Sequence, residues 1–137
     1  MSRNSSNQYG RAAVLAVEIL TKHPAQHPKD AWSKAMKEVT DSKESQIKSC
    51  PKSAFLGLCE EGFVKGIPKG KYTKSAKNKK YAVRIAEYIH IHPMDEYDKN
   101  ELWSYAIKDE VSSQKQDQQI VGVVLAIKNS GLLNNLK

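Results

Sequence analysis

The chain has 137 residues, of which 27% are charged, and its formal net charge is +7 at pH 7. A chain of this length forms one domain, or two very small ones, with a modest core. No apolar run approaches the ~18 residues of a membrane span, and the N-terminal residues do not resemble a signal peptide. Since there are also only two cysteines, we expect a cytoplasmic protein with free thiols and no membrane contact.

Two amphipathic helices are expected in the first 40 residues. In residues 9–23, apolar side chains recur at three- and four-residue spacing, and Pro24 ends the pattern. A second helix over residues 31–39 carries Trp32 on its buried face. Residues 1–8 are mostly polar and predict a flexible tail.

A third helix is predicted from Pro51 to Gly62. Proline suits the first helical turn, and glycine readily takes the left-handed conformation that ends a helix. Residues 63–67 then indicate an edge strand, and residues 68–70 a turn to a returning strand at residues 72–73. A helix followed by a small basic β-hairpin is typical of a winged helix-turn-helix. A loop on a helical bundle is an equally compatible alternative.

The same order of elements recurs at an offset of 69 residues, and a Trp-Ser pair recurs with two extra residues in the linker. The identical residues at matching places are Ala13/Ala82, Val14/Val83, Glu18/Glu87, His23/His92, Pro24/Pro93, Leu56/Leu125 and Gly62/Gly131. We therefore predict a mainly all-α protein of two pseudo-repeated three-helix units, 9–73 and 74–137. Packing through their tryptophan-bearing helices would join the units into one compact domain.

Positive charge is concentrated in one window of the sequence. Residues 62–86 carry eight basic side chains and no acidic one, whereas residues 85–137 carry five basic and eight acidic ones. The basic residues of the window are Lys65, Lys69, Lys71, Lys74, Lys77, Lys79, Lys80 and Arg84. Lysines that neutralise phosphates release counterions and give sequence-independent affinity for nucleic acid. The same residues would also suit an acidic protein partner, or form a solvated surface without a ligand.

Chemical groups outside this window give a weaker signal. Cys50 lies at the start of the third helix, where the helix dipole and nearby lysines would lower the pKa of a thiol. Such a thiol could serve as a nucleophile or redox sensor, and the candidate bases are His23, His27, His90 and His92. Cys59 lies on the apolar helix face and is predicted to be a core residue. The histidine and cysteine spacing does not fit zinc, and no cofactor motif occurs, so neither a metal nor a cofactor is predicted.

The segment Cys50–Pro68 has the pattern CPKxAFLGLCEEGxVKGIP, followed by Tyr-Thr at 72–73 and Lys-Asn-Lys at 77–79. Together with Tyr9-Gly-Arg-Ala-Ala and Asp30-Ala-Trp, it resembles a family of small, uncharacterised bacterial proteins. The resemblance implies a bacterial or mobile-element origin. It implies no activity, so no catalytic residue can be transferred.

The leading hypothesis is a non-enzymatic binding module that contacts nucleic acid through the lysine-rich hairpin and the following helix start. The alternative is an adaptor or inhibitor that binds an acidic protein. A thiol enzyme or sensor using Cys50 is the third hypothesis. The sequence does not show whether the ligand is DNA, RNA or a protein, and it does not give the oligomeric state.

Overall fold

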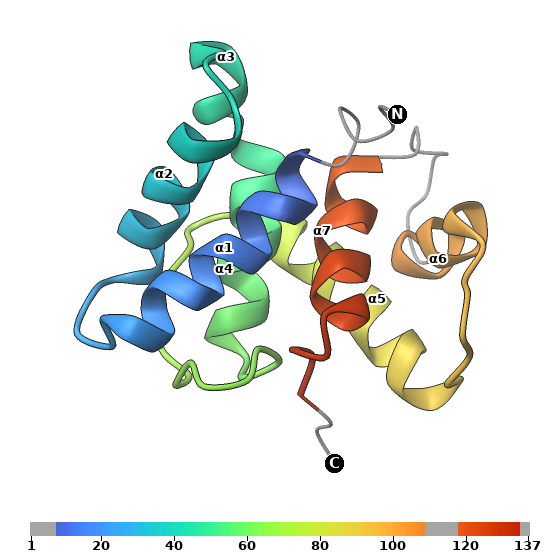
Figure 1. Ribbon diagram of the computed structural model, residues 1–137. Helices are drawn as coiled ribbons and strands as arrows, with labels where there is room; N and C mark the ends of the chain where they lie inside the picture. The colour runs from blue at the N-terminus through green and yellow to red at the C-terminus, as the bar shows by residue number, and fades with distance from the viewer. Residues whose placement is uncertain (1–7, 109–117, 135–137) are drawn as a thin grey trace.

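The computed structural model describes residues 8–108 and 118–134, and within these ranges it is all-α with one isolated β-bridge (Figure 1). The helices are α1 (Gln8–Lys22), α2 (Pro28–Val39), α3 (Lys43–Gln46), α4 (Ser49–Glu60), α5 (Ala76–Ile91), α6 (Lys99–Ala106) and α7 (Gln118–Asn129). The predicted all-α class is therefore confirmed, although the one-turn helix α3 was not expected. None of these helices is long and apolar enough to cross a lipid bilayer.

Side-chain caps explain where several helices begin. The Ser75 hydroxyl accepts a hydrogen bond from the Asn78 N–H at the start of α5, and Asp98 does the same for two N–H groups at the start of α6. At α1 the helix begins at Gln8, one residue earlier than the predicted tail allowed. The remainder of that tail, residues 1–7, lies outside the described residues.

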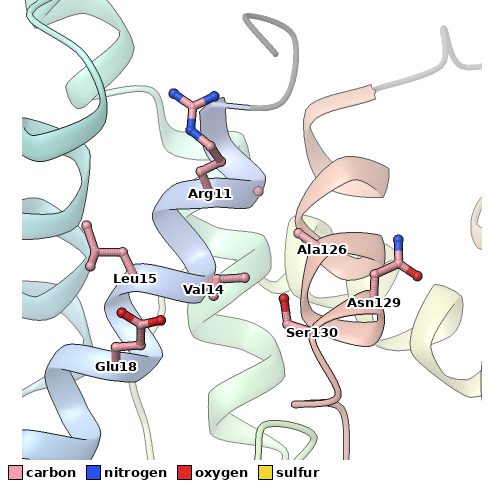
Figure 2. A pocket seen from close by; sticks show the side chains of 8 residues that line it. Arg11, Val14, Leu15, Glu18, Ala126, Asn129 and Ser130 are labelled. Carbon is pink, nitrogen blue, oxygen red and sulfur yellow. The ribbon is translucent and has the colours of Figure 1, made fainter. Parts of the chain in front are cut away.

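The two halves of the chain, residues 9–73 and 74–137, contact each other through α1, α4, α5 and α7. Helix α1 packs on α7, and α4 packs on both α5 and α7. Figure 2 shows Val14 pointing from α1 toward α7. The tryptophan-bearing helices α2 and α6 lie at opposite ends of the molecule (Figure 1). The prediction that these two helices join the halves is therefore wrong, because each tryptophan packs within its own half. Trp32 stacks on Phe55, and Trp103 contacts Tyr81.

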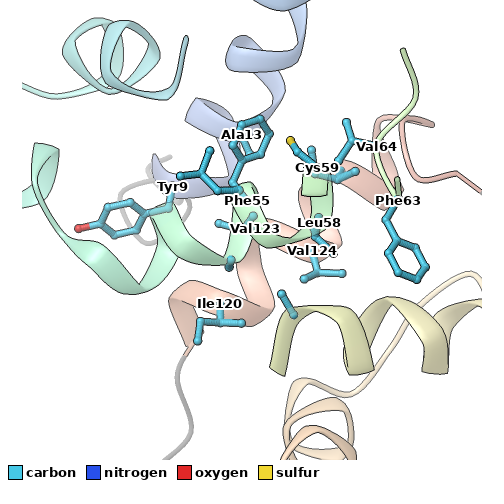
Figure 3. Packing of buried hydrophobic residues seen from close by; sticks show 14 of the residues in the cluster. Tyr9, Ala13, Phe55, Leu58, Cys59, Phe63, Val64, Ile120, Val123 and Val124 are labelled. Atoms are coloured by element: carbon cyan, nitrogen blue, oxygen red, sulfur yellow. The ribbon is translucent and has the colours of Figure 1, made fainter. Parts of the chain in front are cut away.

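Helix α4 lies at the centre of the core (Figure 3). Its residues from Ser53 to Cys59 are all buried, and Phe55 and Leu58 are fully enclosed beside Val123 and Val124 of α7. A recognition helix must expose one face to a DNA groove. The comparison with a winged helix-turn-helix is therefore wrong for this helix, because the core surrounds it.

No β-hairpin follows α4 within the described residues. Val64 instead forms an antiparallel bridge with Leu133, and the Lys65 N–H donates to the Leu132 carbonyl at 2.9 Å. The N–H groups of Tyr72 and Thr73 donate to a carboxylate and not to residues 63–67. The prediction of a wing is wrong because residues 64–65 pair with residues 132–133 and not with residues 72–73.

Several structural features keep the 69-residue offset seen in the sequence. Helices α4 and α7 end at Glu60 and Asn129, which are 69 positions apart. Each is followed by a glycine with positive φ, 82° at Gly62 and 74° at Gly131, which closes the same pair of hydrogen bonds at the helix end. The duplication of the whole unit stays a prediction.

Candidate polyanion-binding site

The basic window begins with a segment, residues 62–75, that returns along α4 to the start of α5 (Figure 1). The first part of this segment is anchored in the core, because Phe63, Val64 and Ile67 are buried. From Pro68 to Ser75 the residues are exposed or half-buried, and Tyr72 is the one of them that packs against the hydrophobic core.

The carboxylate of Glu60, the last residue of α4, holds the second part of the segment. Its Oε1 accepts hydrogen bonds from the N–H groups of Tyr72, at 2.7 Å, and Thr73, at 3.0 Å. Its Oε2 accepts a hydrogen bond from Lys79 Nζ at 2.5 Å. Partial burial opposes ionisation, but these hydrogen bonds outweigh it and lower the pKa of Glu60 to about 2. One carboxylate therefore joins the helix end, the returning segment and α5.

The side chain of Tyr72 also stabilises the segment. Its hydroxyl donates to the Pro68 carbonyl at 2.6 Å, and its ring contacts the His27 ring edge-on at a centroid distance of 5.4 Å. Gly70 lies beneath the ring, where an added Cβ would come within 2.8 Å of it. These contacts make Tyr72 part of the scaffold, so that it is not a free platform for base stacking.

The eight predicted basic residues divide into two groups. Lys65, Lys69, Lys71, Lys74 and Lys77 are exposed. The other three are half-buried and have partners in the protein. Lys79 lies 2.5 Å from carboxylate oxygens of both Glu60 and Glu61. These hydrogen bonds raise its pKa, so it is a structural cation with no charge left for a ligand.

The side chains of Lys80 and Arg84 also contact other groups of the protein. The Lys80 ammonium lies 5.8 Å from the centre of the Tyr81 ring, and Arg84 Nη1 donates to the Ala106 carbonyl on α6 at 3.0 Å. Even exposed Lys69 has a packed stem, because an added Cβ on Gly62 would lie 3.0 Å from its Cε. We define the basic strip as Lys65, Lys69, Lys71, Lys74 and Lys77.

The two cysteines occupy different environments. Cys59 is fully buried, and burial raises the pKa of its thiol, which confirms the prediction of a core residue. Cys50 is half-buried in the first turn of α4, where the N-cap residue Lys48 contributes no side-chain cap. Its reactivity stays a prediction. Of its candidate bases, His27 contacts Tyr72 and His92 contacts Tyr88.

Over residues 8–108 and 118–134, no group of three or more His, Cys, Asp or Glu side chains is arranged to hold a metal ion. The functional residue that sequence reasoning missed is Glu60. Its carboxylate binds the backbone of Tyr72 and Thr73 in the segment that carries most of the basic strip. Its only sequence signal was its place at the helix end, directly before Glu61 and Gly62.

The family model of DUF6979, described as a family of unknown function, matches residues 6–134. No curated protein and no solved structure matches the chain. The resemblance drawn from the Cys50–Pro68 motif to an uncharacterised family is thus confirmed.

Proposed function

The chain belongs to this family of unknown function, and we propose that it is a non-enzymatic binding module that contacts nucleic acid through the basic strip. The observation that carries the proposal is the fixed path of a lysine-bearing segment with no acidic residue between positions 62 and 86. Four exposed lysines lie on this segment and the fifth, Lys77, lies in the first turn of α5, and the Glu60 carboxylate holds the backbone of the segment.

The chemistry of the strip favours phosphates over bases. Lysine is a flexible point charge without the planar fork with which arginine reads guanine, and the one arginine of the window is bound to Ala106. Helix α4 is buried and Tyr72 is engaged, so neither groove reading nor stacking supports sequence recognition. The proposed contact is therefore electrostatic and largely independent of base sequence.

Charge reversal in the strip tests this proposal. We expect Lys69→Glu/Lys71→Glu/Lys74→Glu to lower affinity for fluorescein-labelled single- and double-stranded oligonucleotides at least tenfold at low salt, measured by anisotropy. The matched control is Lys34→Glu/Lys37→Glu/Lys43→Glu on α2 and α3, which changes the net charge equally at exposed positions. If both variants lost the same affinity, the effect would come from net charge and not from the basic strip, which would contradict the proposal. Absence of binding by the wild type would remove the proposal.

Two other functions are separable by the same variants. An acidic protein partner would be captured by the wild type and lost with the strip variant, while oligonucleotides would not bind at all. A thiol enzyme or sensor requires an activated Cys50. Alkylation of Cys50 at pH 7 no faster than that of a model thiol would contradict that role.

We also infer that the chain descends from a duplicated three-helix unit. Support comes from the ends of α4 and α7, which are 69 positions apart, from the positive-φ glycines that follow them, and from the Val64–Leu133 bridge between positions 69 apart. The packing partners correspond as well, since α5 contacts α4 as α1 contacts α7.

A further inference from the structure

An open cleft of about 380 Å³ lies next to the basic strip, because Lys69 belongs to both. Part of its lining is a single face of α5, whose residues lie at positions i, i+4, i+7 and i+8: Val83, Glu87, His90 and Ile91. The rest of the lining comes from the connection after α4, which contributes Glu61, Phe63 and Lys69. A chain molecule that is bound at Lys69 therefore has this cleft within reach.

The apolar part of the lining suits a flat ring system. Phe63 is buried, Val83 is half-buried, and Ile91 leaves 59% of its surface exposed. The volume of the cleft lies within the range of small-ligand pockets, which begins at roughly 300 Å³. The exposed His90 ring adds a flat surface of the kind on which unpaired nucleobases stack. These side chains thus fit one nucleobase that is not paired in a duplex.

The polar part of the lining has one carboxylate available for a ligand. Glu61 already pairs with Lys79, whereas Glu87 is exposed and forms no ion pair within residues 8–108 and 118–134. A carboxylate accepts two parallel hydrogen bonds from a ligand that presents two N–H groups side by side. Guanine presents such a pair, at N1 and at its 2-amino group, whereas thymine has no amino group. Glu87 therefore favours guanine.

We propose that this cleft binds one unpaired nucleobase of a single strand and prefers guanine, with the base edge on Glu87 and a neighbouring phosphate on Lys69. The inference rests on the proposed function, since the basic strip must hold the strand for the base to enter. The cleft adds a preference at one nucleotide, whereas the strip binds the other phosphates without regard to sequence. A duplex keeps its bases paired and gains only the contacts of the strip.

The test compares single strands that differ at one position. Fluorescein-labelled oligothymidylates of about nine nucleotides, with thymidine, deoxyguanosine or deoxyinosine at the centre, are titrated with the full chain and followed by anisotropy. We expect deoxyguanosine to raise the affinity about fivefold over thymidine, because a bidentate contact with a base edge discriminates against the wrong base. Deoxyinosine lacks only the 2-amino group, and its strand should have an intermediate affinity.

Variants of the cleft make the test specific. Glu87→Gln should reduce the preference for deoxyguanosine to less than about twofold, because the amide presents N–H donors to those of the base. The matched control is Glu18→Gln, which makes the same change in net charge at an exposed position of α1 and should keep the preference. His90→Ala should lower the affinity for all three single strands about threefold and leave that for a duplex unchanged. Circular dichroism shows whether each variant keeps its helices.

The outcomes separate this inference from the proposed function. Equal affinity for the three single strands, or a preference that Glu87→Gln retains, would overturn the role of the cleft. Reversal of Lys69, Lys71 and Lys74 would still lower every affinity in that case, if the strip alone binds nucleic acid. Failure of every oligonucleotide to bind would remove both proposals.

Discussion

At the scale of single residues, Glu60 does the most to connect the fold to the basic strip. Its side chain is only 13% exposed and binds one ammonium and two backbone N–H groups. We expect Glu60→Gln to lower the free energy of unfolding by about 1–3 kcal/mol, because charge-assisted hydrogen bonds are lost in a partly buried place. Thermal or denaturant unfolding at pH 7 measures this loss.

The pH dependence of the free energy of unfolding gives a second test of the Glu60 carboxylate. Its pKa is lowered from 4.5 to about 2 in the folded protein, so its contribution is complete above pH 4.5. The contribution is then lost as the pH falls toward 2, since the unfolded state binds the proton first. The wild type should therefore lose more stability than Glu60→Gln between these pH values. Parallel pH profiles for the two proteins would contradict the role given to Glu60.

The close crossing of α4 and α5 gives a separate prediction. An added Cβ on Gly57 would lie 2.9 Å from the Lys79 backbone, which cannot move aside as a side-chain end can. We expect Gly57→Ala to destabilise the protein by about 1–3 kcal/mol in urea unfolding, despite the higher helix propensity of alanine. Gly66→Ala is the control, because this site has open space and only the strain of a φ of 81°. A more stable Gly57→Ala protein would show that the helices do not cross this closely.

Residue identity was only partly informative about the site. A count of charges found the basic window, and the structure describes every member of it. Sequence could not separate Lys79 from Lys77, because the difference lies in a contact with Glu60, nineteen positions earlier. The same holds for Arg84, whose partner carbonyl at Ala106 belongs to another helix.

At the scale of elements, the segments after α4 and α7 depend on one another. Asn134 reinforces the Val64–Leu133 bridge, because its N–H donates to the Phe63 carbonyl and its side-chain amide to the Gly62 carbonyl. We expect the double variant Val64→Ala/Leu133→Ala to deviate from additivity by at least ~0.5 kcal/mol in the free energy of unfolding. The basis is that residues paired directly across a bridge contact each other.

The control for this cycle pairs Val64→Ala with Leu102→Ala on α6, a buried residue of a helix at one end of the molecule. These two substitutions should be additive. If the Val64 and Leu133 substitutions were additive as well, the two segments would fold independently, and the bridge would not explain why the hairpin is absent.

Helices were predictable and the connection after α4 was not, for one physical reason. Apolar periodicity, Pro51 and Gly62 are local signals, and they gave the extent of α4 to within a few residues. A strand is defined by its partner, and the partner of Val64 is a residue near the other end of the chain. The burial of α4 on every side was likewise set by α5 and α7, which a single helical segment does not reveal.

At the scale of the whole molecule, the two halves share one core but differ in charge and in side-chain filling. At the crossing of α4 and α5, Lys79 forms ion pairs with Glu60 and Glu61. The basic strip lies mainly on the segment that connects these two helices. At the crossing of α1 and α7, an open cleft is lined by Gly10 and Ser130, among other residues. The proposed ligand of the basic strip is a polyanion, and the strip lies next to the helix crossing that Lys79 closes.

The central claim is that the basic strip is a fixed polyanion-binding surface, and the salt dependence of binding tests it most directly. The logarithm of the association constant for a duplex oligonucleotide, plotted against the logarithm of salt concentration, should be linear with a slope of about −3 to −5, as five lysines would give. Reversal of Lys69, Lys71 and Lys74 should make this slope shallower by about 2–3 units, while the α2–α3 control variant keeps it. A flat plot for the wild type, or an equal slope for the strip variant, would contradict the claim.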